Sequence, residues 1–151
     1  MNMKIINLCL LTLLISLQVV AKDRLEIFTD YELSKEVLSV TTVKVDPNME
    51  DIYLAGLTNS WIKAVKIQKE LGYIKDWNIW ASELPQSGEF NLVLTVTFAS
   101  AEDLEPNKTK YDAFMKKWGK ENQKISEETS AKYPEVRELT GEYRLRKVIF
   151  K

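Results

Sequence analysis

Histidine is absent from all 151 residues of the chain. It is the commonest general base at neutral pH, a usual ligand of zinc, copper and non-haem iron, and a member of Ser-His-Asp and Cys-His catalytic sites. Its absence therefore excludes these kinds of site, together with the proximal histidine of most haem proteins. We expect the chain to bind no metal ion and no cofactor.

Cysteine and glycine are scarce as well. The one cysteine, Cys9, lies in an apolar N-terminal run that we expect to be removed, which leaves no thiol for catalysis, an iron–sulfur cluster or a disulfide. The five glycines are far apart in the sequence, so there is no glycine-rich loop to hold a phosphate group. The mature fold must therefore depend on its hydrophobic core.

Neither sign of charge is in excess, since 21 basic and 22 acidic residues give a formal net charge of −1. Proteins that bind nucleic acids or anionic membranes usually present a basic surface. The balance of charge therefore argues against both kinds of partner.

Residues 1–21 have the features of a secretory signal peptide. Lys4 precedes an apolar run over residues 5–20, and Ala21 precedes a charged pair. We expect cleavage after Ala21, a periplasmic or secreted protein, and no stable membrane insertion after cleavage. The alternative is an uncleaved membrane anchor, but the run is slightly shorter than the ~20 apolar residues that a spanning helix needs.

Hydrophobic periodicity predicts one long amphipathic helix from Met49 to Gly72. Its apolar residues recur at steps of three and four, as one helical face requires. They are Met49, Tyr53, Leu57, Trp61, Ala64, Val65 and Leu71. Pro47 suits the start of this helix, where its missing N–H is not needed, and Gly72 suits the end, where the backbone must be permissive.

After Gly72 the period changes from about 3.6 to about 2, which predicts two strands, Tyr73–Ala81 and Phe90–Phe98. Pro85 and Gly88 lie in the connection, whose length and composition are typical of a hairpin. We therefore expect these two strands to pair in antiparallel fashion.

Further patterns complete the set of elements in a single domain, residues 36–151. The predicted elements are a strand over Glu36–Val45, a capped turn of helix over Ser100–Leu104, a second helix over Lys108–Tyr133 with a break at Gly119, and a last strand over Glu142–Phe150. The preceding N-terminal arm, residues 22–35, is consistent either with a short extra strand or with a loose segment. The resulting order is the ferredoxin-like βαββαβ arrangement of the α+β class, a four-stranded antiparallel sheet with two helices on one face.

If both helices cover one face, the opposite face of the sheet is left open. The larger apolar residues of one strand are then expected beneath the helices: Phe90, Leu92, Leu94, Val96 and Phe98. The open face is expected to carry Asn78, Trp80, Ser82, Asn91, Val93, Thr95 and Thr97, joined by Arg144 and Arg146 of the last strand. This set is too apolar for an ordinary wet surface, so we expect a homodimer in which two such faces enclose a cavity.

The four tryptophans divide into two pairs. Trp61 and Trp118 lie on the apolar faces of the predicted helices, which assigns them to the core. Trp77 and Trp80 have opposite parity on one strand, so one faces the helices and the other faces the cavity or the dimer seam. The strand assignment above favours Trp80 for the cavity, but the pattern is compatible with either.

Three segments resemble small proteins of the dimeric α+β barrel superfamily, which includes the antibiotic-biosynthesis monooxygenases. They are Ile67–Trp77, whose helix closes in Gly-x-Ile-x-x-Trp, the strand Phe90–Phe98, and Ala99–Leu104 with its Ser-x-Glu-Asp-Leu. The resemblance covers about Glu36 to Lys151 and implies a dimeric α+β barrel. Members include cofactor-free monooxygenases, haem-degrading enzymes, muconolactone isomerase-like enzymes and exported proteins of no known activity, so it implies no particular reaction. The haem-binding histidine of the haem-degrading members has no counterpart here.

The leading hypothesis is an exported dimeric barrel without catalytic machinery, which binds a small, partly apolar or aromatic molecule or serves as an interaction module. The candidate ligand-binding residues are Asn78, Trp80, Thr95, Arg144 and Arg146. The alternative is a cofactor-independent monooxygenase or isomerase acting on an aromatic substrate, in which an arginine stabilises the substrate anion. Arg144 and Arg146 are, however, more typical of a solvated strand face. A third hypothesis is a structural partner of another envelope protein.

Overall fold

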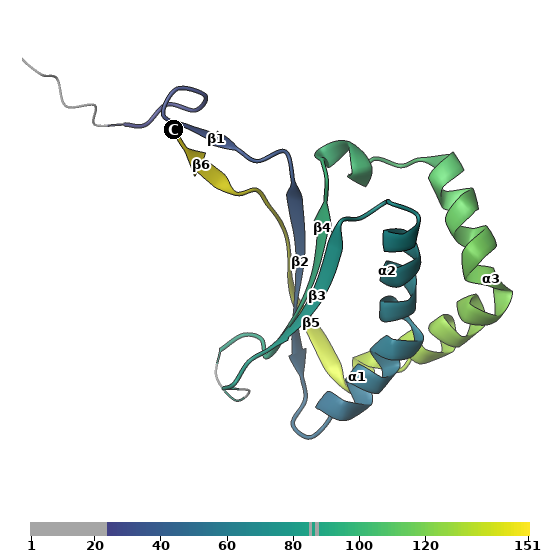
Figure 1. Cartoon of the computed structure of the whole chain (residues 1–151). Helices are drawn as coiled ribbons and strands as arrows, with labels where there is room; N and C mark the ends of the chain where they lie inside the picture. Colours follow the sequence, from purple (N-terminus) through teal and green to yellow (C-terminus); the bar gives the residue numbers. More distant parts are fainter. Residues whose placement is uncertain (1–23, 85, 87) are drawn as a thin grey trace, which may run out of the picture.

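The computed structural model describes residues 24–84, 86 and 88–151 (Figure 1). The signal peptide that the sequence predicts over residues 1–21 lies outside the described residues. Within the described ranges, no helix combines the length and the apolar character that crossing a membrane requires.

Strands and helices are mixed along the chain, which confirms the predicted α+β class. The helices are α1 (Glu50–Asn59), α2 (Trp61–Glu70) and α3 (Lys108–Ser130), with two short 3-10 helices, η1 (Ala101–Leu104) and η2 (Tyr133–Glu135). The strands are β1 (Tyr31–Leu33), β2 (Val37–Val45), β3 (Asp76–Ala81), β4 (Leu92–Phe98), β5 (Arg137–Leu145) and β6 (Val148–Phe150).

Four of the strands form one antiparallel sheet in the order β3-β4-β2-β5. β2 lies inside this sheet, so that Thr41 has Leu94 of β4 on one side and Glu142 of β5 on the other. The β-branched residues of β2 suit a central strand, where side chains pack against both neighbours. The predicted strand over Glu36–Val45 is therefore confirmed, as is the antiparallel pairing of the two strands that follow the helical region.

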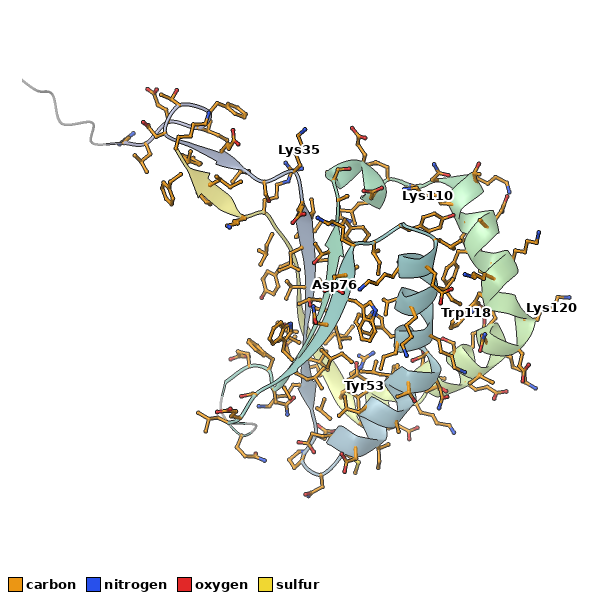
Figure 2. All side chains as sticks on the ribbon, in the orientation of Figure 1. Lys35, Tyr53, Asp76, Lys110, Trp118 and Lys120 are labelled. Atoms are coloured by element: carbon orange, nitrogen blue, oxygen red, sulfur yellow. The ribbon has the colours of Figure 1, made fainter. Side chains whose placement is uncertain are left out.

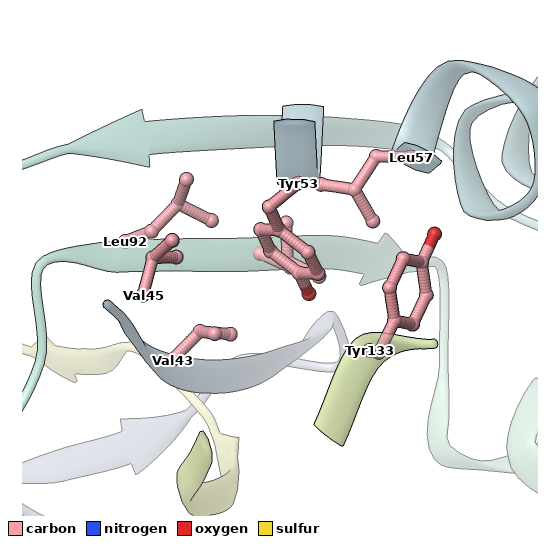
Figure 3. Packing of buried hydrophobic residues seen from close by; sticks show 7 residues of the cluster. Val43, Val45, Tyr53, Leu57, Leu92 and Tyr133 are labelled. Carbon is pink, nitrogen blue, oxygen red and sulfur yellow. The ribbon is translucent and has the colours of Figure 1, made fainter. Parts of the chain in front are cut away.

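All three helices lie on one side of this sheet (Figure 1). Side chains of α1, η2, β2 and β4 meet there in the hydrophobic core (Figure 3): Val43, Val45, Tyr53, Leu57, Leu92, Leu94 and Tyr133. Because side chains alternate along a strand, a layer of helices on one side buries only every second residue. In the described part of the chain, the other face of the four-stranded sheet has no helix over it.

The predicted single helix from Met49 to Gly72 is wrong in one respect, because the chain forms two helices that break at Ser60. Ser60 has φ −130° and ψ −93°, well outside the helical range. Its hydroxyl donates to the backbone O of Gly56 at 3.0 Å and bonds with the hydroxyl of Tyr133 at 2.5 Å. The apolar spacing continues across this break, so hydrophobic periodicity gave no sign of it.

The break predicted at Gly119 is present. Gly119 has φ 74° and ψ 163° inside an otherwise helical run, and α3 bends there. Its neighbour Trp118 is 4% exposed, and the indole N–H donates to Gln123 Oε1 at 2.9 Å. Figure 2 shows Trp118 on the side of α3 that faces α2, while Lys120 points away from the protein. The predicted core position of Trp118 is therefore confirmed.

The C-terminal region differs most from the prediction. The residues predicted as one strand over Glu142–Phe150 belong to two strands, because β5 begins earlier, at Arg137, and β6 leaves the main sheet to pair with β1. Tyr31 lies opposite Phe150 in the resulting two-stranded ribbon, which projects from one end of the sheet (Figure 1). Of the two alternatives for the N-terminal arm, the extra strand is the one observed.

The second strand of the hairpin begins at Leu92 and not at Phe90 as predicted. Phe90 is 43% exposed, so the expectation that it lies beneath the helices is wrong. Asn91 is buried, and its side-chain amide bonds with the backbone N and O of Val45, both at 2.8 Å. Asn91 therefore holds the end of β2 and does not lie on the open face, where the sequence had placed it.

Candidate functional site

The tryptophans of β3 show which residues lie on each face of the sheet. The ring of Trp77 packs edge-on against Trp61 of α2, with 5.7 Å between ring centroids, so Trp77 points toward the helices. Trp80 has the opposite parity and is 60% exposed. Trp80 therefore lies on the face that the helices leave open.

Three of the predicted ligand contacts lie together on this open face. Asn78 and Thr95 are register partners in β3 and β4. The indole N–H of Trp80 donates to Thr95 Oγ1 at 3.4 Å, and the Thr95 hydroxyl donates to the backbone O of Asn78 at 3.4 Å. Thr95 itself is buried, so Trp80 offers the largest apolar surface of the three to a ligand or to a second chain.

Arg144, the fourth predicted contact, lies on the opposite face. In the register of β2 with β5, Tyr143 lies opposite Val40 and Arg144 lies opposite Ser39. Val40 is also the register partner of Thr95, which places Tyr143 on the open face and Arg144 on the side of the helices. The expectation that Arg144 joins the open face is therefore wrong.

Arg146 follows the end of β5 and precedes β6, so it lies in the connection between these two strands. It lines a hollow of about 310 Å³ together with Arg144, Leu104 and Glu105, next to η1. The two arginines thus lie close to each other, and Arg146 also lines a second hollow of about 350 Å³ with the open-face residues Leu38, Thr97 and Leu145; Trp80 lines neither hollow. The sequence misplaced them because it assigned the apolar residues of the last strand to the helix side.

Those apolar residues lie on the open face instead. Tyr143 and Leu145 of β5 are 52% and 48% exposed there. The ring of Tyr143 covers Gly141, because a Cβ built on Gly141 would come within 2.6 Å of the Tyr143 hydroxyl oxygen. Half-buried apolar side chains of the two central strands continue the same surface: Leu38, Val40 and Val93. The open face is consequently more apolar than the sequence predicted.

A second candidate site lies in a cleft of about 370 Å³ between the helices and the sheet. Residues of α1, α2, α3, β2, β4, β5 and η2 line it: Thr41, Tyr53, Leu57, Ser60, Trp61, Ala64, Leu94, Ser126, Ser130, Tyr133, Arg137 and Leu139. Among these described lining residues, Arg137 alone carries a charge. We call this space the Arg137 cleft.

Two tyrosine rings hold Arg137 in place. Its Cζ lies 5.3 Å from the ring centroid of Tyr133 and 5.9 Å from that of Tyr53, which is the range of cation–π contacts. The two rings pack edge-to-face with 5.0 Å between centroids, and Figure 3 shows them next to each other in the core. Arg137 Nε is buried and has no hydrogen-bond partner among the described residues.

The phenols beside Arg137 are neutral at pH 7. Burial raises the pKa of Tyr53 above its ordinary value of 10.0, although the nearby charge of Arg137 opposes this shift. Burial also raises the pKa of Tyr133, against the opposing effects of its hydrogen bond with Ser60 and of Arg137. Neither tyrosine therefore supplies a negative charge to balance the guanidinium.

The sequence did not predict the Arg137 cleft. The last strand was predicted to begin at Glu142, which left Arg137 in a connection, and Tyr133 was expected to end a helix. One feature of the sequence could have indicated the cleft: Arg137 follows the apolar Tyr133 and Val136 and precedes Leu139, so the arginine lies within an apolar stretch. Within the described chain no group of three or more acidic residues is arranged to hold a metal ion.

The chain is similar to known proteins in its structure. No protein-family model and no curated protein matches the chain. Protein SO0527 from Shewanella oneidensis has a similar structure, with a TM-score of 0.50, 12% sequence identity, and coverage of 80% of this chain and 99% of that one. HapK from Hahella chejuensis matches with a TM-score of 0.45 and 10% identity, covering 74% and 91% of the two chains. At these identities the likeness to SO0527 concerns the fold alone, and the likeness to HapK carries no conclusion.

Proposed function

We propose that this chain is an exported, non-catalytic module that binds a small ligand or another protein and acts as a homodimer, with a ferredoxin-like βαββαβ core. The strand order β3-β4-β2-β5 and the three helices on one side of the sheet support the ferredoxin-like assignment. The observation that carries the proposal is the open face, where Trp80 and Tyr143 are both more than half exposed. Exposed aromatic and aliphatic side chains that share one face are typical of interaction sites.

In the proposed dimer, the open faces of two copies pack on each other about a two-fold axis. This arrangement buries the exposed rings of Trp80 and Tyr143 and makes a dimeric α+β barrel. The polar pair Asn78 and Thr95 then lies inside the barrel, where it is available to a small, partly apolar or aromatic molecule.

Export is proposed from the sequence of residues 1–21. A basic start, an apolar run and Ala21 at its end favour a periplasmic or secreted mature protein. N-terminal sequencing of the protein made in its own host tests this directly, since we expect the mature chain to begin at Lys22.

The enzymatic alternative has less support. A cofactor-independent monooxygenase or isomerase acting on an aromatic substrate would need an anion-stabilising group beside the aromatic face of Trp80. Of the candidates for that role, Arg144 lies on the side of the helices, and Arg146 lines two hollows of which Trp80 is not part. A ligand-binding or interaction module is therefore the better supported proposal.

The test of the dimer is the oligomeric state of residues 22–151 in solution. Multi-angle light scattering at micromolar concentration should give the mass of two chains, and native mass spectrometry of protein from its own host should show any small molecule that it retains. A stable monomer at tens of micromolar would contradict the proposal.

A further inference from the structure

The Arg137 cleft contains a positive charge that the protein leaves without a negative partner. No ion pair involving Arg137 is formed within the described chain, and its Nε has no hydrogen-bond partner there. The faces of Tyr53 and Tyr133 stabilise the guanidinium in part. A partly buried arginine is ordinarily paired with an acid, because removing a charge from water is costly. An anion that entered the cleft would supply the missing pair.

The rest of the lining is apolar with a few hydroxyl groups. Leu57, Trp61, Leu94 and Leu139 provide the apolar walls. Leu139 is 44% exposed although it is on the side of the sheet that the helices cover, so the helix layer leaves part of this strand uncovered at the cleft. A ligand that fits these walls has an apolar body.

Hydroxyl groups of α3 lie on the same cleft. Ser126 and Ser130 are one helical turn apart, and both line it. Neither hydroxyl forms a hydrogen bond with another described residue, whereas the hydroxyl of Ser60 is already bonded with Gly56 and Tyr133. The two α3 serines are therefore available to a polar group of a ligand.

The number of charges selects the class of anion. One guanidinium forms a planar fork of N–H donors that matches one carboxylate and balances its single charge. A phosphate group with two charges would leave one of them unbalanced, because Arg137 is the one charged residue among the described lining residues. We propose that the Arg137 cleft binds a small molecule with one carboxylate and an apolar body, and that the carboxylate pairs with the guanidinium of Arg137. The volume of about 370 Å³ is at the lower end of the range for small-molecule sites.

This inference rests on the proposed function only in taking the chain to be a ligand-binding module. The cleft is formed within one chain, on the side of the sheet away from the proposed dimer contact. Carboxylate binding and dimerisation are therefore separate properties and can be measured separately.

The test is isothermal titration calorimetry of residues 22–151 with three carboxylates, phenylacetate, 4-phenylbutyrate and octanoate, and with 4-phenylbutyramide as the neutral match of one of them. We expect saturable binding of at least one acid, with one site per chain, and at least tenfold weaker binding of the amide. This comparison of the acid with the amide uses the wild-type protein alone. Inorganic phosphate is titrated in parallel. Absence of saturable binding by all three acids, equal binding of acid and amide, or tighter binding of inorganic phosphate would each overturn the proposal.

Two variants locate the site. Arg137→Gln should weaken binding of the acid at least tenfold, and Arg137→Lys, which keeps the charge but loses the planar fork, should have an intermediate effect. Arg144→Gln is the matched control, because Arg144 is on the same strand but lines a different hollow, and it should bind like the wild type. Equal losses in the Arg137 and Arg144 variants would overturn the assignment to Arg137. Light scattering on the same samples separates a failed dimer from a failed ligand site.

Discussion

Gly119 is the residue whose backbone conformation most restricts what can replace it. With φ 74° and ψ 163°, it occupies a region that is essentially closed to residues with a Cβ. No atom lies near the position of a Cβ built on Gly119, so the cost of replacement comes from the backbone alone. The bend of α3 therefore depends on glycine at this one position.

We predict that Gly119→Ala lowers the free energy of unfolding by roughly 1–3 kcal/mol, since alanine must adopt the same strained conformation or straighten the helix. Thermal unfolding followed by circular dichroism should show a fall in Tm of several degrees. The neighbouring variant Lys120→Ala, on the exposed side of the bend, should change stability by less than about 0.5 kcal/mol. An unchanged Tm for Gly119→Ala would show that the bend is not required.

The two buried tyrosines predict a dependence of stability on pH. The folded-state pKa values of Tyr53 and Tyr133 are raised above the ordinary value of 10.0, so the folded protein keeps these phenol protons at pH values where the unfolded chain releases them. The contribution of these two tyrosines to the free energy of unfolding is complete below pH 10.0. It is lost as the pH rises through their folded-state pKa values.

Urea unfolding at pH values from 8 to 11 should therefore show stability falling at the alkaline end. Lysines titrate in the same range, so the informative quantity is the difference from Tyr53→Phe, which should lose stability less steeply above pH 10. Parallel curves for the wild type and this variant would contradict the prediction.

Sequence patterns predicted single residues well where a local rule applies. The capping box at Ser100 and Asp103 is confirmed, with the backbone N–H of Ser100 donating to Asp103 Oδ2 at 3.2 Å, because such a motif depends only on residues three apart. The face predicted for Arg144 was wrong. It depends on the register of β5 with β2, which shifts between Thr42 and Val43, and no property of β5 alone reveals that shift.

At the scale of elements, the predictions were correct for the type of each strand and helix and less accurate for their ends. β3 begins at Asp76 although the alternation starts at Tyr73, and the first helical region is divided at Ser60. At β3, the Tyr73 N–H donates to Gln68 O at 2.9 Å, so Tyr73 belongs to the turn that ends α2. At Ser60, the side-chain hydroxyl bonds with that of Tyr133, which is far along the chain. Bonds between distant residues cannot be read from a local period.

The ribbon of β1 and β6 supplies a prediction at the same scale. Isolated two-stranded ribbons are marginally stable, and this one pairs only three residues of each strand. We predict that removing residues 148–151 abolishes hydrogen-exchange protection of the Tyr31–Leu33 amides and lowers the stability of the main sheet by no more than about 1 kcal/mol. Mass-spectrometric hydrogen exchange can measure both effects, and loss of protection in β2 or β5 would show that the ribbon supports the whole fold.

At the scale of the whole molecule, the sequence predicted the α+β class and the four-stranded antiparallel sheet, because alternating and helical periods occur in distinct segments. The cleft around Arg137 could not be predicted in this way. Its lining comes from α1, α2, α3, η2 and three strands, so it exists only after those elements have packed. Local patterns in a single sequence do not predict a site that is assembled from so many elements.

The open face yields the prediction that best tests the assembly. We expect Trp80→Lys to weaken the proposed dimer by about 2 kcal/mol or more, roughly thirtyfold in dissociation constant, because it places a charge at the centre of an apolar contact. Sedimentation equilibrium would measure this change. Tyr111→Lys is a matched control, since Tyr111 is on α3 and is 61% exposed compared with 60% for Trp80. Equal dissociation constants for the two variants would place the interface elsewhere.

The pairing of β1 with β6 also has a consequence for biosynthesis. Translation produces Tyr31 long before Phe150, its register partner, so the two strands cannot join until almost the entire described chain has been made. Until then the nascent protein has an unpaired strand edge close to its leading end, and a chaperone or export factor that recognises extended segments has access to it throughout elongation. Closure of the ribbon would end that access.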